Sequence, residues 1–142
     1  MKVQELMSKP VIRIHADEPV AVAARTLAHY NIGVMPVCGT DGRLCGMLTD
    51  RDLVTRCLAA GKSPERTTVR DVMTAQVLSV TPDADVTLAA HMMASRQVRR
   101  LPVVENGRLC GMITLGDLAN SEEKNLEAAD VLMEITSNIS LR

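Results

Sequence analysis

A segment of six residues occurs twice in this chain, and no other feature of the sequence restricts the fold as strongly. Gly42–Met47 and Gly107–Met112 both read GRLCGM. The similarity extends on either side of this segment, so that the two copies cover about residues 3–53 and 69–118. A unit of roughly 50 residues buries too little surface to be stable alone. We therefore expect the two copies to pack into one globule.

Both copies show the same order of local patterns. Short aliphatic runs predict strands, apolar residues at helical spacing predict a helix, and a glycine-containing turn between two runs predicts a hairpin. The first copy is predicted to form a strand, a helix, a two-stranded hairpin and a second helix at residues 11–14, 20–30, 34–38, 43–48 and 49–61. The second helix should stop at Gly61, a residue suited to a helix C-terminus. The second copy begins with the corresponding strand at 77–80.

The predicted fold class is α/β, or α+β, with two β-α-β-β-α repeats and a C-terminal helix. The predicted domains are repeat 1 at residues 1–62, repeat 2 at 63–120 and a helical tail at 121–142. Apolar residues of the tail fall on one helical face. They are Ala128, Val131, Leu132, Ile135 and Ile139. This stripe can pack on the core of the chain or on a partner, and the sequence leaves both open.

The composition argues against nucleic-acid and membrane partners. The formal net charge is −1, and Tyr30 is the only aromatic residue among Trp, Phe and Tyr. Nucleic-acid binding relies on a basic field and on aromatic stacking, so we expect no nucleic-acid partner. No apolar run reaches the ~18 residues of a membrane span, and the N-terminus lacks a signal-peptide pattern. We therefore expect a cytoplasmic protein that does not contact a membrane.

The sequence indicates neither a metal centre nor catalysis. The four cysteines form no C-x-x-C pair, which favours reduced thiols at Cys38, Cys45, Cys57 and Cys110. For zinc binding or redox chemistry, the only candidate residues are Cys38, His15, His29 and His91. No nucleophile–base set, phosphate-binding lysine loop or H-E-x-x-H motif is present, so we expect no enzyme.

A Thr-x-x-Asp motif follows the hairpin in each copy, at Thr49 and Asp52 and again at Thr114 and Asp117. Thr-x-x-Asp at a helix start is also a capping box, in which the two side chains bind the backbone at the helix N-terminus. The functional interpretation uses the same position. The hydroxyl can donate to a phosphate and the carboxylate can accept from sugar hydroxyls, beside unpaired backbone N–H groups. On this interpretation each motif holds a ribose.

Apolar residues near the strand ends complete this hypothesis. Val11 and Val77, together with Met35 and Leu101, are expected to sandwich a flat base without aromatic stacking. Backbone groups around the prolines of the hairpins are expected to read the edge of that base. These prolines are Pro36 and Pro102.

The motifs resemble those of CBS domains, the modules named after cystathionine beta-synthase. The likeness rests on Asp71–Thr74, on Val98–Val104 and on the two Gly-x-x-Thr-x-x-Asp blocks, and it covers residues 3–118. The chain is most similar in type to small stand-alone CBS-pair proteins of bacteria, such as hypoxic response proteins. Asn31–Val37 and Gly46–Asp52 carry that closer likeness.

The resemblance implies a ligand and an assembly. Two sheets would pack about a pseudo-two-fold and leave two clefts, which in the family often bind AMP, ADP, ATP, S-adenosylmethionine or NAD, although some members have empty clefts. Positions for ribose and phosphate match Thr49, Asp52, Thr114 and Asp117, and polar positions near the base or sugar match Ser8 and Thr74. The implied partner is an adenine nucleotide or a related small molecule, with no cofactor required. Family modules also commonly form homodimers.

The two copies differ in charge. Arg99 and Arg100 precede the second strand of repeat 2, where repeat 1 has Gly33 and Val34, and Arg51 has no basic counterpart. The resemblance implies that phosphates lie toward the pseudo-axis, where these three arginines would converge. The alternative is that the arginines are solvated or paired with neighbouring acids.

The sequence therefore predicts a regulatory or sensor CBS-pair protein that binds an adenosyl ligand between its repeats. The bound ligand would change its conformation or assembly and thereby act on a protein partner that the sequence does not identify. The alternative is a dimeric protein-interaction module that binds no nucleotide.

Overall fold

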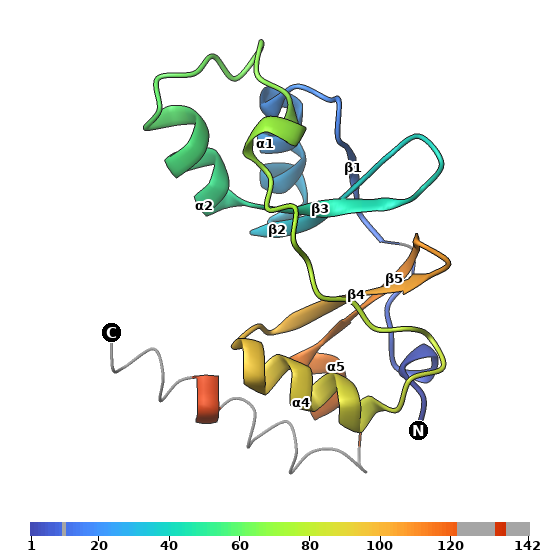
Figure 1. Ribbon diagram of the computed structural model, residues 1–142. Coiled ribbons are helices and arrows are strands. Elements are labelled where there is room, and N and C mark those ends of the chain that lie inside the picture. The colour runs from blue at the N-terminus through green and yellow to red at the C-terminus, as the bar shows by residue number, and fades with distance from the viewer. Residues whose placement is uncertain (10, 122–132, 136–142) are drawn as a thin grey trace. The chain divides into compact units, whose positions relative to one another are not determined.

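The computed structural model describes residues 1–9, 11–121 and 133–135, and it divides the chain into two compact units (Figure 1). The first-repeat unit comprises Ile12–Val77 and Gly107–Leu109. The second-repeat unit comprises Met1–Val11, Leu78–Asn106 and the chain from Cys110 onward. Each unit has its own hydrophobic core, so each is described by itself.

The first-repeat unit contains a three-stranded sheet covered by helices. Its elements are β1 (Ile14–His15), α1 (Val20–Tyr30), β2 (Val34–Cys38), β3 (Leu44–Thr49), α2 (Asp50–Asp52), the π-helical η2 (Leu53–Leu58) and α3 (Val69–Val72). The strand order is β1-β2-β3, with β1 parallel and β3 antiparallel to β2. Figure 1 shows α1 packed beside this sheet. The predicted helix over 20–30 and the predicted hairpin are confirmed.

Local chemistry explains why these elements form. Val20, Ala23 and Leu27 recur at helical spacing and are the buried residues of α1. In the hairpin, Met35 lies opposite Leu48, and both side chains enter the core of the unit. Gly42 has φ +80 in the turn, a conformation that a residue without Cβ adopts without strain.

The second-repeat unit repeats this plan around its own core. Its elements are η1 (Val3–Glu5), α4 (Val86–Arg96), β4 (Arg100–Glu105), β5 (Arg108–Thr114), whose first two residues are grouped with the first-repeat unit, and α5 (Leu115–Ala119). The core gathers Val86, Ala89, Ala90 and Met93 from α4 with residues of the β4-β5 hairpin. Asp85 caps α4 by accepting the N–H of Thr87 at 2.8 Å.

The predicted strand at 77–80 is wrong over most of its length. Only Val80 pairs, in an isolated parallel bridge with Val103. In the first-repeat unit the N–H of Ala16 donates to the carbonyl of Cys38 at 3.0 Å. Pro82 stands at the position equivalent to Ala16, and because proline has no N–H the pairing with β4 does not continue beyond Val80 as β1 continues to His15. Residues 77–79 are not in a strand, and neither are their counterparts 11–13.

Two other predicted elements have different limits. The strand predicted at 11–14 is confined to Ile14–His15. The helix predicted over 49–61 has one α-helical turn and then continues as a π-helix to Leu58. Gly61 has φ +71, as a residue that ends a helical segment often does.

The segment that opens each repeat packs in the unit built around the other repeat. Val3 of η1 is fully buried in the second-repeat unit, where its N–H donates to Ala84 O at 2.8 Å. Val69 of α3 is fully buried in the first-repeat unit, where its N–H donates to Glu18 O at 2.9 Å. The compact units therefore divide the chain at other points than the repeats of the sequence do.

Most of the predicted C-terminal helix lies outside the described residues. Residues 133–135 are helical, and Ile135 is buried in the core of the second-repeat unit. The remaining residues of the apolar stripe are not described. They are Ala128, Val131, Leu132 and Ile139. In the described part of the chain, no helix has both the length and the apolar character needed to cross a membrane.

Candidate ligand-binding sites

In the first-repeat unit, Thr49 and Asp52 join the end of β3 to α2. The N–H of Thr49 donates to Asp52 Oδ2 at 3.1 Å, and the N–H of Asp52 donates to Thr49 Oγ1 at 3.0 Å. This reciprocal pair is a capping box, so the structural interpretation of the motif is correct. Asp52 is only 8% exposed, whereas Thr49 is half-buried. The cap holds the carboxylate in one orientation at the end of the strand.

Arg56 is a residue of this site that the sequence reasoning missed. Its Nε lies 3.8 Å from Asp52 Oδ1, and its Nη1 donates to Met73 O at 3.0 Å. The guanidinium thus connects the helical segment to the residue just before Thr74. The signal in the sequence was the i,i+4 spacing of Asp52 and Arg56.

Thr74 is held beside β3 by its backbone. The N–H of Met47 donates to Thr74 O, and the N–H of Thr74 donates to Met47 O, both at 2.9 Å. At Gly46, the neighbour of Met47, an added Cβ would overlap the carbonyl oxygen of Thr74. The glycine is therefore required for this close approach of two backbones. The structure thus places Thr49 at the end of β3, Asp52 in the helix that follows it, and Thr74 beside Met47 of the same strand.

The second-repeat unit has the same arrangement. The N–H of Thr114 donates to Asp117 Oδ2 at 2.8 Å, and the N–H of Asp117 donates to Thr114 Oγ1 at 3.1 Å. Ser8 pairs with Met112 of β5, donating to its carbonyl at 2.8 Å and accepting from its N–H at 3.3 Å. At Gly111 an added Cβ would lie 3.0 Å from Ser8 O. The glycine shared by both GRLCGM segments therefore has the same task in each unit.

The apolar candidates lie in different environments. Met35 and Leu101 are buried in the cores, each 1% exposed. The two prolines are also buried, while two valines at the unit boundaries are half-buried. These are Pro36, Pro102, Val11 and Val77. Val11 follows Ser8 by three residues, and Val77 follows Thr74 by three residues. Each valine therefore lies close in sequence to a polar candidate.

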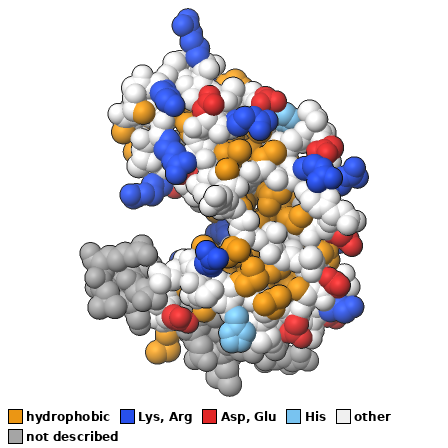
Figure 2. All heavy atoms as spheres, in the orientation of Figure 1, with side chains coloured by type: hydrophobic (Ala, Val, Ile, Leu, Met, Phe, Trp, Pro, Cys, Tyr) orange, Lys and Arg blue, Asp and Glu red, His pale blue; other side chains and the backbone are white. Residues whose placement is uncertain are grey.

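The three arginine candidates belong to different units. Arg51 is exposed in α2 of the first-repeat unit, while Arg99 and Arg100 are exposed at the start of β4 in the second-repeat unit. Their convergence on one phosphate stays a prediction. On the face shown in Figure 2, Lys and Arg side chains are interspersed with Asp and Glu and form no continuous basic stripe.

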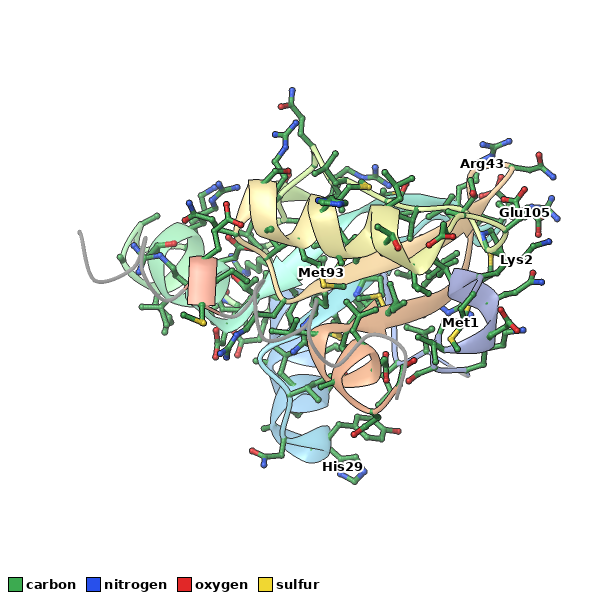
Figure 3. All side chains as sticks on the ribbon, turned by 90° about the horizontal axis from the view of Figure 1, so that it is seen from below. Met1, Lys2, His29, Arg43, Met93 and Glu105 are labelled. Atoms are coloured by element: carbon green, nitrogen blue, oxygen red, sulfur yellow. The ribbon has the colours of Figure 1, made fainter. Side chains whose placement is uncertain are left out.

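The cysteines and histidines form no metal centre in the part of the chain that the structure describes. All four cysteines are free thiols, and Cys38 and Cys57 are buried. Burial raises the pKa of Cys38, against the opposing effect of the nearby Arg13. His29, at the exposed end of α1, points away from the body of the unit (Figure 3).

Comparison with known proteins identifies the fold family. The CBS domain model matches residues 3–59 and residues 69–124. The chain belongs to the CBS domain family. CBS-pair proteins are generally regulatory rather than catalytic.

Three relatives show how far the similarity extends. The uncharacterized protein YlbB of Bacillus subtilis is 40% identical over 136 residues, which cover 95% of this chain and 91% of YlbB. The crystal structure of Hypoxic Response Protein I with two coordinated zinc ions has 35% identity and a TM-score of 0.77, covering 84% of this chain and 97% of its own. The CBS domain pair of protein MJ0100, in complex with 5-methylthioadenosine and S-adenosyl-L-methionine, has 29% identity and a TM-score of 0.71 over 84% of this chain and 93% of its own. These findings confirm the resemblance drawn from the sequence.

Proposed function

We propose that this CBS-pair protein is a sensor that binds an adenosyl ligand at its two Thr-x-x-Asp motifs. One observation carries the proposal. The same constellation is built twice from separate stretches of chain, with Thr49, Asp52 and Thr74 in one unit and Thr114, Asp117 and Ser8 in the other. The family relative MJ0100, which binds two adenosyl compounds, supports this class of ligand. AMP, ADP, ATP and NAD are further candidates.

The capping role of each motif is compatible with ligand binding. A carboxylate has about four acceptor sites on its two oxygens, and the backbone N–H of the threonine uses one of them. Vicinal ribose hydroxyls are donors that match the remaining acceptor sites. The cap also fixes the carboxylate before the ligand arrives, which lowers the entropy cost of binding.

The ligand would act on conformation or assembly. We propose that the protein catalyses no reaction, works in the cytoplasm without a required cofactor, and forms a homodimer that transmits the bound state to a protein partner. Cyclic two-fold dimers are the commonest soluble oligomers. Neither nucleic acid nor a membrane is part of the proposal.

Calorimetric titration with AMP, ATP, adenosine and S-adenosylmethionine tests ligand binding directly. We expect binding of at least one of these compounds, with weaker binding after Asp52→Asn or Asp117→Asn. Glu18→Gln is the matched control, since this exposed acid lies before α1, at the opposite end of that helix from β2. If no adenosyl compound binds the wild-type protein, the proposal is wrong.

A second candidate function rests on exposed apolar side chains of the first-repeat unit. Val54 and Leu58 of η2 are 55% and 62% exposed, and Tyr30 at the end of α1 is 52% exposed. Such residues fit a protein interface, so a dimeric interaction module without nucleotide is the alternative. Light scattering on Leu58→Lys, with and without adenosyl compounds, separates the two. If Leu58→Lys is monomeric and the wild-type dimer binds no adenosyl compound, the alternative function is favoured.

A further inference from the structure

The two candidate sites differ in charge at one equivalent place. In the first-repeat unit the N–H of Asp50 donates to Gly33 O at 2.9 Å, and in the second-repeat unit the N–H of Leu115 donates to Arg99 O at 2.7 Å. The same backbone hydrogen bond therefore joins the start of the hairpin to the residue after the motif threonine. An acid and a glycine occupy these positions in one unit, and an apolar residue and an arginine occupy them in the other.

The carboxylate of Asp50 is folded against the backbone next to Thr49. Its Oδ1 accepts the N–H of Arg51 at 2.8 Å. Its Oδ2 lies 3.2 Å from the point where a Cβ on Gly33 would stand, so a side chain at residue 33 would press on the carboxylate. The glycine thus leaves room beside the motif for a negative charge of the protein itself, on a side chain that is exposed to solvent.

The other charges of the first-repeat site do not change its sign to positive. Asp50 and Asp52 provide two carboxylates, and Arg51 and Arg56 provide two cations. Arg56 is already engaged, by Asp52 Oδ1 and by the carbonyl of Met73. Asp52 and Arg56 offset each other, so a further anion would meet the Asp50 carboxylate and the exposed Arg51 without a net positive charge.

The second-repeat site instead has an excess of positive charge, with two arginines and one aspartate. Arg99 and Arg100 are exposed at the start of β4, and Asp117 is the one acid of the motif. Leu115, in the place of Asp50, brings no charge. An anion arriving here would meet cations that can bind a phosphate with charge-assisted hydrogen bonds.

We propose that Asp50 makes the first-repeat site selective for adenosyl ligands without a phosphate, while the second-repeat site selects phosphorylated ones. This inference rests on the proposed function. A ribose is small, so a ribose bound through its hydroxyls by Asp52 would bring its 5′ substituent within reach of Asp50, two residues away in the chain. A phosphate there would face the Asp50 carboxylate, whereas a thioether, a hydroxyl or a sulfonium would not be repelled.

The test isolates each site in the full-length protein. Asp117→Asn weakens the second-repeat site, so titrations of this variant with AMP and with adenosine report chiefly on the first-repeat site. Adding Asp50→Asn removes one negative charge with little change in shape. We expect the double variant to bind AMP at least tenfold more tightly than Asp117→Asn alone, with adenosine affinity changed less than twofold. Adding Glu18→Gln instead is the control for net charge, and it should leave both affinities unchanged.

The outcomes separate the inference from the proposed function. If adenosine binds the Asp117→Asn variant but Asp50→Asn leaves AMP affinity unchanged, the selectivity assigned to Asp50 is wrong and the binding function stands. If Glu18→Gln raises the affinity for AMP as much as Asp50→Asn does, the change in net charge explains the effect and the inference is also wrong. If neither AMP nor adenosine binds the wild-type protein, the proposed function fails and the inference with it.

Discussion

Gly46 lies so close to Thr74 that a methyl group on the glycine would overlap the carbonyl oxygen of the threonine. The two strands of chain are joined there by a pair of 2.9 Å hydrogen bonds between Met47 and Thr74. We expect Gly46→Ala to destabilise the protein by about 1–3 kcal/mol, because backbone must shift to admit the methyl group. Urea unfolding measures this change.

Gly39→Ala is the control for this prediction. Gly39 is in the same hairpin, its φ is not positive, and an added Cβ would make ordinary contacts at 3.6 Å with Cys45 Sγ. Its effect should stay within about 0.5 kcal/mol. Equal destabilisation by both substitutions would show that the contact with Thr74 is not what restricts residue 46.

Two substitutions of Asp52 separate its capping role from its ligand role. Asp52→Asn keeps an oxygen that can accept the N–H of Thr49 but removes the charge, so stability should change little. Its affinity for an adenosyl ligand should fall by ~1–3 kcal/mol, because charge-assisted hydrogen bonds to ribose are lost. Asp52→Ala should lose the ligand and in addition about 1 kcal/mol of stability. Unchanged affinity in Asp52→Asn, measured by calorimetry, would leave the aspartate as a cap alone.

Arg100→Ala should weaken AMP binding far more than adenosine binding. Each charge-assisted hydrogen bond to a phosphate is worth ~1.5–3 kcal/mol. Removing the charge of Arg100 should also make the affinity for AMP less dependent on salt concentration. Titration at two salt concentrations measures both effects. Arg25→Ala on α1 removes an exposed arginine of the other unit and serves as the control. If the two variants behave alike, the arginines at the start of β4 are solvated surface.

Val69→Ala should destabilise the protein by roughly 1.5–3 kcal/mol, as expected for the loss of two buried methyl groups. Val69 is fully buried in the core of the first-repeat unit although it belongs to the opening segment of the second repeat. Val54→Ala is the matched control, since Val54 is 55% exposed. An equally small effect of both substitutions would contradict the packing of α3 in that core.

Cys38 should react slowly with alkylating reagents at neutral pH. Burial raises its pKa above the ordinary value of 9.0 despite the opposing effect of Arg13, so the reactive thiolate is scarce. The neutral thiol is then favoured in the folded state. The contribution of the Cys38 thiol to the stability of the fold is complete at a pH below its pKa in the unfolded chain. It is lost as the pH rises through the higher pKa that the thiol has in the folded protein. Mass spectrometry of alkylated peptides should show Cys38 modified after the half-buried Cys45, and faster labelling of Cys38 at pH 7 would contradict this.

Several elements follow from the sequence because their causes are local. The duplication predicts two units of the same plan, and the spacing of Val20, Ala23 and Leu27 predicts α1. The capping box at Thr49 and Asp52 needs only two residues three positions apart and a helix start. Such features depend on neighbours within one or two helical turns, so a sequence displays them directly.

Other features were decided by contacts between distant parts of the chain. Val3 and Val69 fill the core of the unit that the other repeat builds, and nothing in their neighbouring residues indicates which core they enter. Pro82 limits the pairing of Val80 because the position equivalent to Pro82, Ala16, donates a hydrogen bond across to β2. The carboxylate of Asp50 lies 3.2 Å from the point where a Cβ on Gly33, seventeen residues earlier, would stand, and only the folded chain brings these two residues together. Sequence patterns record which residues are apolar or charged, but long-range packing alone determines which of them meet.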